Sequence, residues 1–123
     1  MRWLALVALV ACATGPGKNE VTGKTGRTGG WKAKVTAATF DGNLTTIALG
    51  PRVSIVIASC YAHAQQKVGD HDHVQISLDG KPPSEGELDI ADCTTTHVVA
   101  TMWARFADGT KLEAAIDTDL ARR

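Results

Sequence analysis

The recurrence of an apolar side chain at every second position of residues 98–106 constrains the fold of this chain more than any other feature. Val98, Ala100, Met102, Ala104 and Phe106 occupy every second position. Because successive side chains of a β-strand point to opposite faces, the pattern predicts a long strand in which these five apolar residues share one face. The chain is therefore expected to build a sheet that buries one of its two faces.

The same period of two recurs in several other segments, whereas residues 52–60 are apolar at both parities and suit a central strand. Strands are expected at residues 31–37, 45–49, 52–60, 74–78, 87–90, 98–106 and 112–116. Asp-Gly pairs stand where turns are needed, at 41–42, 79–80 and 108–109. Only 62–68 is predicted to be helical, for one or two turns before Gly69. About seven short strands predict an all-β domain, a small antiparallel β-sandwich or barrel. An immunoglobulin-like sandwich is one option, although no tryptophan lies between Cys60 and Cys93.

The last hairpin has two possible registers. A two-residue loop at 108–109 would mix its apolar and polar faces, whereas a three-residue loop at 107–109 places Phe106 opposite Thr110 and aligns the apolar faces. Gly109 then takes the left-handed position of a bulge. This register also points Trp103 away from the main core, either beneath a second sheet or toward a ligand.

The N-terminus has the pattern of an export signal. Arg2 is the only charge before the apolar run 3–11. Nine residues suit the apolar part of a signal peptide, about 7–15 residues long, and are too few to cross a bilayer, which needs about 20. Residues 1–11 are therefore expected to be cleaved off.

The tetrad Leu-Val-Ala-Cys at 9–12 resembles the lipobox of bacterial lipoproteins. The resemblance implies diacylglycerol on Cys12, which makes the membrane a partner through this lipid. In a diderm bacterium, Ala13 in place of aspartate implies sorting to the outer membrane. Two alternatives stay open: ordinary signal-peptidase cleavage at Ala11-Cys12-Ala13, which yields a free protein, and a buried N-terminal strand or helix.

Residues 12–30 are rich in Gly, Thr and Lys, and Val21 is their single aliphatic residue beyond the signal. Such a segment buries too little apolar surface to offset its ordering entropy. We therefore expect a lipidated cysteine and a flexible tether at 12–30, with a reach of roughly 20–25 Å. A single β domain is expected at 31–123.

A lipid on Cys12 leaves Cys60 and Cys93 as an even pair in an oxidising compartment. We predict a Cys60–Cys93 disulfide, which would stabilise the domain by roughly 3–4 kcal/mol through loop-closure entropy. Two free buried thiols, or metal ligation by cysteine and histidine, are the alternatives.

His71 and His73 lie in the segment Gly-Asp-His-Asp-His at 69–73 and share one side of an extended chain. With a third ligand from His63 or His97, they would form a site for Cu or Zn. The alternative is a polar, pH-sensitive loop at the start of a strand.

Other chemical motifs are excluded. Gly23-Lys24-Thr25 lacks the first glycine of a phosphate-binding loop, because position 18 is lysine. The acids at 85, 87, 89 and 92 fit the wet face of a strand and lack calcium-loop spacing. Ser59, Tyr61 and His63 do not form a triad, because adjacent strand residues point apart.

The net charge of the chain does not indicate nucleic-acid binding. The 13 Lys/Arg and 13 Asp/Glu residues cancel, although residues 1–52 have a net charge of +5 and the rest −5. We therefore expect a non-enzymatic, cofactor-free envelope lipoprotein, whose disulfide-stabilised β domain binds an envelope protein or glycan or has a structural role. The alternative is a Cu- or Zn-binding lipoprotein that uses His71 and His73.

Overall fold

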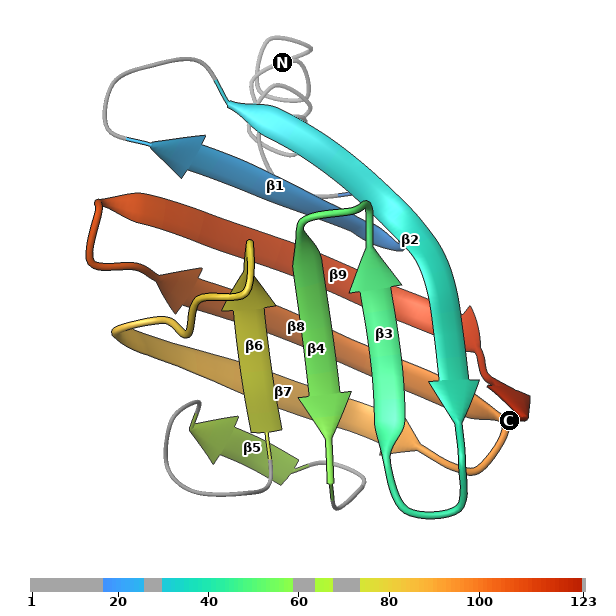
Figure 1. Cartoon of the computed structure of the whole chain (residues 1–123). Helices are drawn as coiled ribbons and strands as arrows, with labels where there is room; N and C mark the ends of the chain where they lie inside the picture. The colour runs from blue at the N-terminus through green and yellow to red at the C-terminus, as the bar shows by residue number, and fades with distance from the viewer. Residues whose placement is uncertain (1–16, 26–29, 59–63, 68–73, 123) are drawn as a thin grey trace, which may run out of the picture.

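The computed structural model describes residues 17–25, 30–58, 64–67 and 74–122, and these contain ten strands and no helix (Figure 1). The strands are β1 (Glu20–Thr25), β2 (Trp31–Phe40), β3 (Thr45–Leu49), β4 (Val53–Ile57), β5 (Ala64–Lys67), β6 (Val74–Leu78), β7 (Glu85–Cys93), β8 (His97–Arg105), β9 (Thr110–Asp119) and β10 (Ala121–Arg122). The predicted all-β class is confirmed, with more strands than the seven expected.

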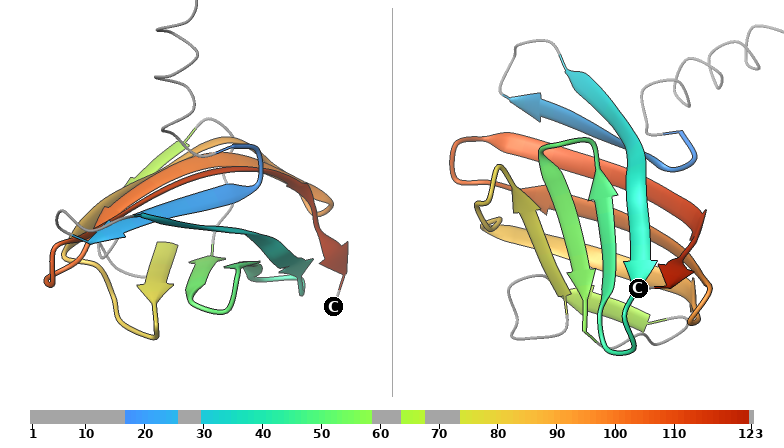
Figure 2. Two further views of the ribbon diagram at one scale, coloured as in Figure 1. Left: turned by 90° about the horizontal axis from the view of Figure 1, so that it is seen from above. Right: turned by 45° about the vertical axis from the view of Figure 1, so that its right-hand side comes forward.

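One hydrogen-bonded sheet folds over on itself in the order β5-β7-β8-β9-β1-β2-β3-β4-β6. Its first five strands form one layer and β3, β4 and β6 form the other (Figure 1). Seen from above, the first layer arches over the second, so that the sheet nearly closes into a barrel (Figure 2). An immunoglobulin domain instead packs two separate sheets, so that option does not describe this fold.

Strand β2 is the corner that joins the two layers. Residues 31–34 pair with β1, and the strand pairs with β3 from Val35 onward. The register shifts between Val35 and Ala37, and an irregularity of this kind lets a strand bend and twist sharply. At its far end, β2 is joined in parallel by β10, whereas all the other strand pairs between described residues are antiparallel.

The apolar faces of the two layers meet in one core. All five apolar residues of the pattern at 98–106 are buried, the most exposed being Phe106 at 8%. The facing layer contributes aliphatic side chains from β3, β4 and β6, including Ile47, Ile55 and Ile76. The alternation along the sequence therefore predicted the buried face of β8 correctly.

The three-residue loop between β8 and β9 is also confirmed. The Phe106 N–H donates to the Thr110 carbonyl oxygen at 2.9 Å, and Gly109 has a φ of 91°. Asp108 accepts a hydrogen bond from the Thr110 N–H at 2.9 Å. The Thr110 hydroxyl and nearby backbone N–H groups hold the pKa of Asp108 below its ordinary value.

Strand β1 corrects the predicted domain boundary. Residues 20–25 were expected to belong to a flexible tether, yet β1 lies between β9 and β2 and pairs with both. Its one aliphatic residue, Val21, is completely buried. The tether prediction failed because it judged the segment by its own composition, whereas two neighbouring strands satisfy the β1 backbone.

The predicted helix at 62–68 is wrong for its described part. Residues 64–67 form β5, which pairs with β7 from Ala64 opposite Ile90 to Lys67 opposite Glu87. A short polar segment has little helix stability of its own, and pairing with β7 supplies backbone partners that the local sequence does not.

We predict that Val21→Ala lowers the free energy of unfolding by about 1.5–3 kcal/mol, because a fully buried aliphatic side chain is truncated. Urea unfolding followed by circular dichroism measures the change. Lys18→Ala, at an exposed position before β1, is the control and should change stability by less than about 0.5 kcal/mol. Equal midpoints for wild type and Val21→Ala would show that β1 does not contribute to the fold.

Candidate binding face

The outer face of the arched layer has a tryptophan between two carboxylates. Trp103 on β8 lies directly opposite Glu87 on β7 and Glu113 on β9. Residues in register share a face, and neighbouring strands lie about 4.8 Å apart. The three outward side chains therefore form a row across three strands.

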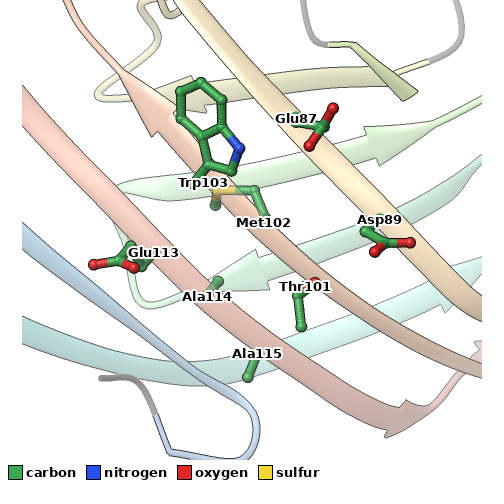
Figure 3. Close-up of a pocket in the computed structure, with 8 residues that line it drawn as sticks. All are labelled: Glu87, Asp89, Thr101, Met102, Trp103, Glu113, Ala114 and Ala115. Carbon is green, nitrogen blue, oxygen red and sulfur yellow. The ribbon is translucent and has the colours of Figure 1, made fainter. Parts of the chain in front are cut away.

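These residues line a hollow of about 320 Å³ on the outer face (Figure 3). A second row lies two residues further along the strands and has the same register. It consists of Asp89, Thr101 and Ala115. The hollow is lined by Glu87, Asp89, Thr101, Met102, Trp103, Glu113, Ala114 and Ala115. We call it the Trp103 hollow.

Strand parity explains why this indole is outside the core. Met102 and Ala104 point inward and are buried, so the residue between them must face out. Trp103 is 37% exposed, and Leu44 is the only other large hydrophobic side chain in the described ranges that is exposed. The prediction that Trp103 points away from the main core is confirmed.

Three carboxylates line the Trp103 hollow. Glu87, Asp89 and Glu113 form no hydrogen bond or ion pair with another side chain in the part of the chain that the structure describes. An exposed carboxylate accepts hydrogen bonds and donates none. The hollow thus combines an apolar indole face with three acceptor groups.

A second, larger hollow of about 860 Å³ adjoins the first, because Glu113 lines both. Its charged residues are mostly cations and its aromatic residues are Trp31 and Phe106. It is lined by Thr22, Gly23, Lys24, Gly30, Trp31, Lys32, Arg105, Phe106, Gly109, Lys111 and Glu113. We call it the cationic hollow.

The Trp31 ring has a fixed place in the cationic hollow. Gly23 lies opposite Trp31 in the β1–β2 register, and a Cβ atom on Gly23 would overlap the indole. The Arg52 guanidinium carbon lies 4.7 Å from the ring centroid. Arg52 also forms a bidentate ion pair with Asp79, with Nη2–Oδ2 at 2.9 Å, and this ion pair lowers the pKa of Asp79.

His97, one of the predicted metal ligands, is held by two carboxylates. Its Nδ1 lies 2.7 Å from Asp119 Oδ1 and its Nε2 lies 2.6 Å from Asp117 Oδ1. The hydrogen bond to Asp119 and, to a smaller extent, the one to Asp117 raise the pKa of His97 above its ordinary value. Both ring nitrogens of His97 therefore lie within hydrogen-bond distance of a carboxylate, and neither is open to a metal in this arrangement.

The other predicted metal ligands, His63, His71 and His73, lie outside the described residues, so the Cu or Zn site stays a prediction. Within the described ranges, no three His, Cys, Asp or Glu side chains are grouped to hold a metal ion.

Cys12 and Cys60 also lie outside the described ranges. Cys93 ends β7, packs partly buried against the core and is disulfide-bonded. Because Cys60 is not described, its pairing with Cys93 stays a prediction.

The sequence alone did not identify either hollow. Glu87 and Asp89 were interpreted as the wet face of a strand, and Lys24 as part of a tether. The available signal was the period of two, which places the outward residues of β7, β8 and β9 on one face once their register is known. Lys24 and Lys32 could not be placed because β1 was not predicted.

Comparisons with family models, with curated proteins and with solved structures find no match to this chain. No helix in the described part of the chain has the length and apolar character that a membrane span requires.

We predict that His97 makes stability depend on pH. Because its folded-state pKa is raised, its contribution is complete below the unfolded value of about 6.5 and is lost as pH rises through the folded-state pKa. The urea midpoint of wild type should therefore exceed that of His97→Gln by more at about pH 5.5 than at about pH 8.5. The other histidines are present in both proteins and cancel in this difference. An equal difference at the two pH values would contradict the role of the pair of carboxylates.

Proposed function

We propose that this chain is an exported, lipid-anchored protein of the bacterial cell envelope, and that its β domain binds a glycan in the Trp103 hollow. The single observation that supports the binding role is the exposed indole of Trp103 between the Glu87 and Glu113 carboxylates.

The chemistry of the Trp103 hollow suits a sugar ring. A pyranose has an apolar face of C–H groups, which can stack on an aromatic ring, and a rim of hydroxyl donors. Tryptophan offers a broad, rigid apolar surface at little cost in side-chain entropy. Glu87 and Glu113, one strand away on either side, are placed to accept hydrogen bonds from the hydroxyl rim, because neither carboxylate has a competing partner among the described side chains.

Asp89 and Thr101 extend the same surface by one step along the strands. Thr101 adds a hydroxyl that both donates and accepts, which the carboxylates do not. A ligand longer than one sugar would therefore find polar groups beyond the indole. The hollow lies on a rigid sheet, so little ordering of the protein would accompany binding.

The proposal is binding rather than catalysis. The described residues that line the Trp103 hollow are carboxylates, a threonine, an indole and small apolar groups. A hydrolase of the triad type needs a nucleophile within hydrogen-bond reach of a base. The hollow has the Thr101 hydroxyl, but the described residues that line it include no histidine or lysine.

The envelope part of the proposal depends on the tetrad at 9–12 and on the cysteines. A lipid on Cys12 would be separated from β1 by seven residues, fewer than in a tether that extends to residue 30. A Cys60–Cys93 disulfide would join the two layers of the sheet, because Cys60 follows β4 by three residues and Cys93 ends β7.

We predict that a neutral sugar trimer, chitotriose, changes the fluorescence of Trp103 in a Trp3→Phe/Trp31→Phe variant, where Trp103 is the sole tryptophan. In the wild-type protein, Trp103→Ala should weaken binding of the trimer at least about tenfold, which corresponds to about 1.4 kcal/mol. Isothermal titration calorimetry measures the affinity.

Leu44→Ala is the matched control, because Leu44 is an exposed hydrophobic residue outside the hollow. It should leave the affinity unchanged. The glycan proposal fails if chitotriose does not bind, or if Trp103→Ala binds it as well as wild type does.

We also predict that the protein from the membrane fraction of a diderm bacterium begins at Cys12 and has the mass of a diacylglycerol adduct. Intact mass spectrometry tests this, with Cys12→Ala as the unlipidated control. A soluble mature chain that begins after Ala13 would favour the ordinary signal-peptidase alternative.

A further inference from the structure

Three cations stand side by side on the outer face at the edge of the cationic hollow. Arg105 on β8 lies directly opposite Lys111 on β9, and Lys111 lies directly opposite Lys24 on β1. All three are exposed. Lys32 on β2 lines the same hollow one register step away, opposite Thr22.

This arrangement is unfavourable in the free protein. Residues directly opposite on antiparallel strands have Cβ atoms about 4.5–5.5 Å apart, and like charges in such pairs are destabilising. The row contains two such pairs in succession and spans two strand spacings, about 10 Å. A ligand with negative charges would relieve this repulsion.

Carboxylates of the protein neutralise little of this row. Arg105 forms an exposed ion pair with Glu85, with Nη1–Oε1 at 3.1 Å. Lys24, Lys32 and Lys111 have no ion pair among the described side chains. Glu113 is the only acidic residue among those that line the cationic hollow, and it also faces the Trp103 hollow.

We infer that the row Arg105–Lys111–Lys24, with Lys32, binds the negatively charged groups of an acidic glycan, whose uncharged sugar lies in the Trp103 hollow. This inference rests on the proposed function and extends it by naming the charge of the ligand. The two sites are close, because Arg105 and Trp103 are separated by one step of two residues along β8, about 7 Å.

The adjoining acidic groups favour a glycan over a nucleic acid. A nucleic acid has a phosphate at every nucleotide and would place some of them near Glu87, Asp89 and Glu113. A glycan that combines an anionic sugar with an uncharged one matches both hollows, since the first favours the cations and the second favours the indole. Electrostatic attraction of this kind weakens as salt increases.

The test compares tri-galacturonate with its methyl ester, which has the same sugars without the charges. We expect Lys24→Gln/Lys111→Gln to weaken binding of tri-galacturonate at low salt at least about tenfold and to leave binding of the methyl ester unchanged. Lys34→Gln is the matched control, because Lys34 is an exposed lysine on the same face of β2 that does not line the hollow. It should change the affinity by less than a factor of about two.

Two further measurements separate a binding role from a structural one. Removal of two adjacent like charges should leave the urea midpoint of Lys24→Gln/Lys111→Gln equal to that of wild type or raise it. In a Trp3→Phe/Trp103→Phe variant, where Trp31 is the sole tryptophan, tri-galacturonate should change the fluorescence of Trp31 in the cationic hollow.

Each of the following outcomes overturns the inference: tri-galacturonate binds no more tightly than its methyl ester, the double variant binds it as wild type does, or an oligothymidylate binds more tightly than either trimer. The last outcome would identify a nucleic-acid site. Failure of the proposed function is distinct, because the Trp103→Ala variant would then bind the methyl ester as wild type does while the charged trimer still depended on Lys24 and Lys111.

Discussion

The fold depends on the insertion of β1 between β9 and β2. Four strands of the arched layer lie on one side of β1, and β2, β3, β4 and β6 lie on the other. The backbone bonds of β1 therefore connect two halves that would otherwise meet mainly through the core. Val21, the one aliphatic side chain of β1, is completely buried between those halves. A strand with so little apolar surface is held mainly by backbone hydrogen bonds to its neighbours. Buried N–H and C=O groups require such hydrogen-bond partners.

The chemistry of the outer face follows from the same insertion. Register with β9 places Lys24 opposite Lys111 on the outer face, whereas register with β2 brings Trp31 against Gly23 on the core-facing side. Without β1, the carboxylates and Trp103 would still share a face, because β7, β8 and β9 pair independently of it. The face therefore has an acidic, aromatic part that the C-terminal strands form alone and a basic part that the N-terminal strand completes. Glu113 lines both hollows and marks the boundary between these two parts of the face.

The period of apolar residues predicted those strands whose own sequences show it. Residues 98–106 have an apolar side chain at every second position, and matching the apolar faces was sufficient to place the loop at 107–109 and the outward orientation of Trp103. The same pattern failed to predict strands that form only because they pair with a strand distant in the sequence. Residues 20–25 and 64–67 are polar and look unlike strands, yet each is paired along its length with a strand far away in the sequence.

The binding face needed this long-range register, since Glu87, Trp103 and Glu113 become neighbours only after the strands pair. His97 was chosen as a metal ligand because its residue type fits, and its pairing with Asp117 and Asp119 comes from the final part of β9, which spacing does not reveal.

The position of β1 also governs the order in which the molecule can be completed. The Asp117 N–H donates to Asn19 Oδ1 at 2.6 Å across 98 residues of sequence, and β1 acquires its β9 partner only after residues 110–119 have been synthesised. Contacts of such high sequence separation slow folding. A chain that emerges from the ribosome N-terminus first would therefore hold β1 without its β9 partner until residues 110–119 have been synthesised. Under the proposed export of this chain across a membrane, the delay would keep the domain open during translocation, because the sheet closes only when β9 pairs with β1.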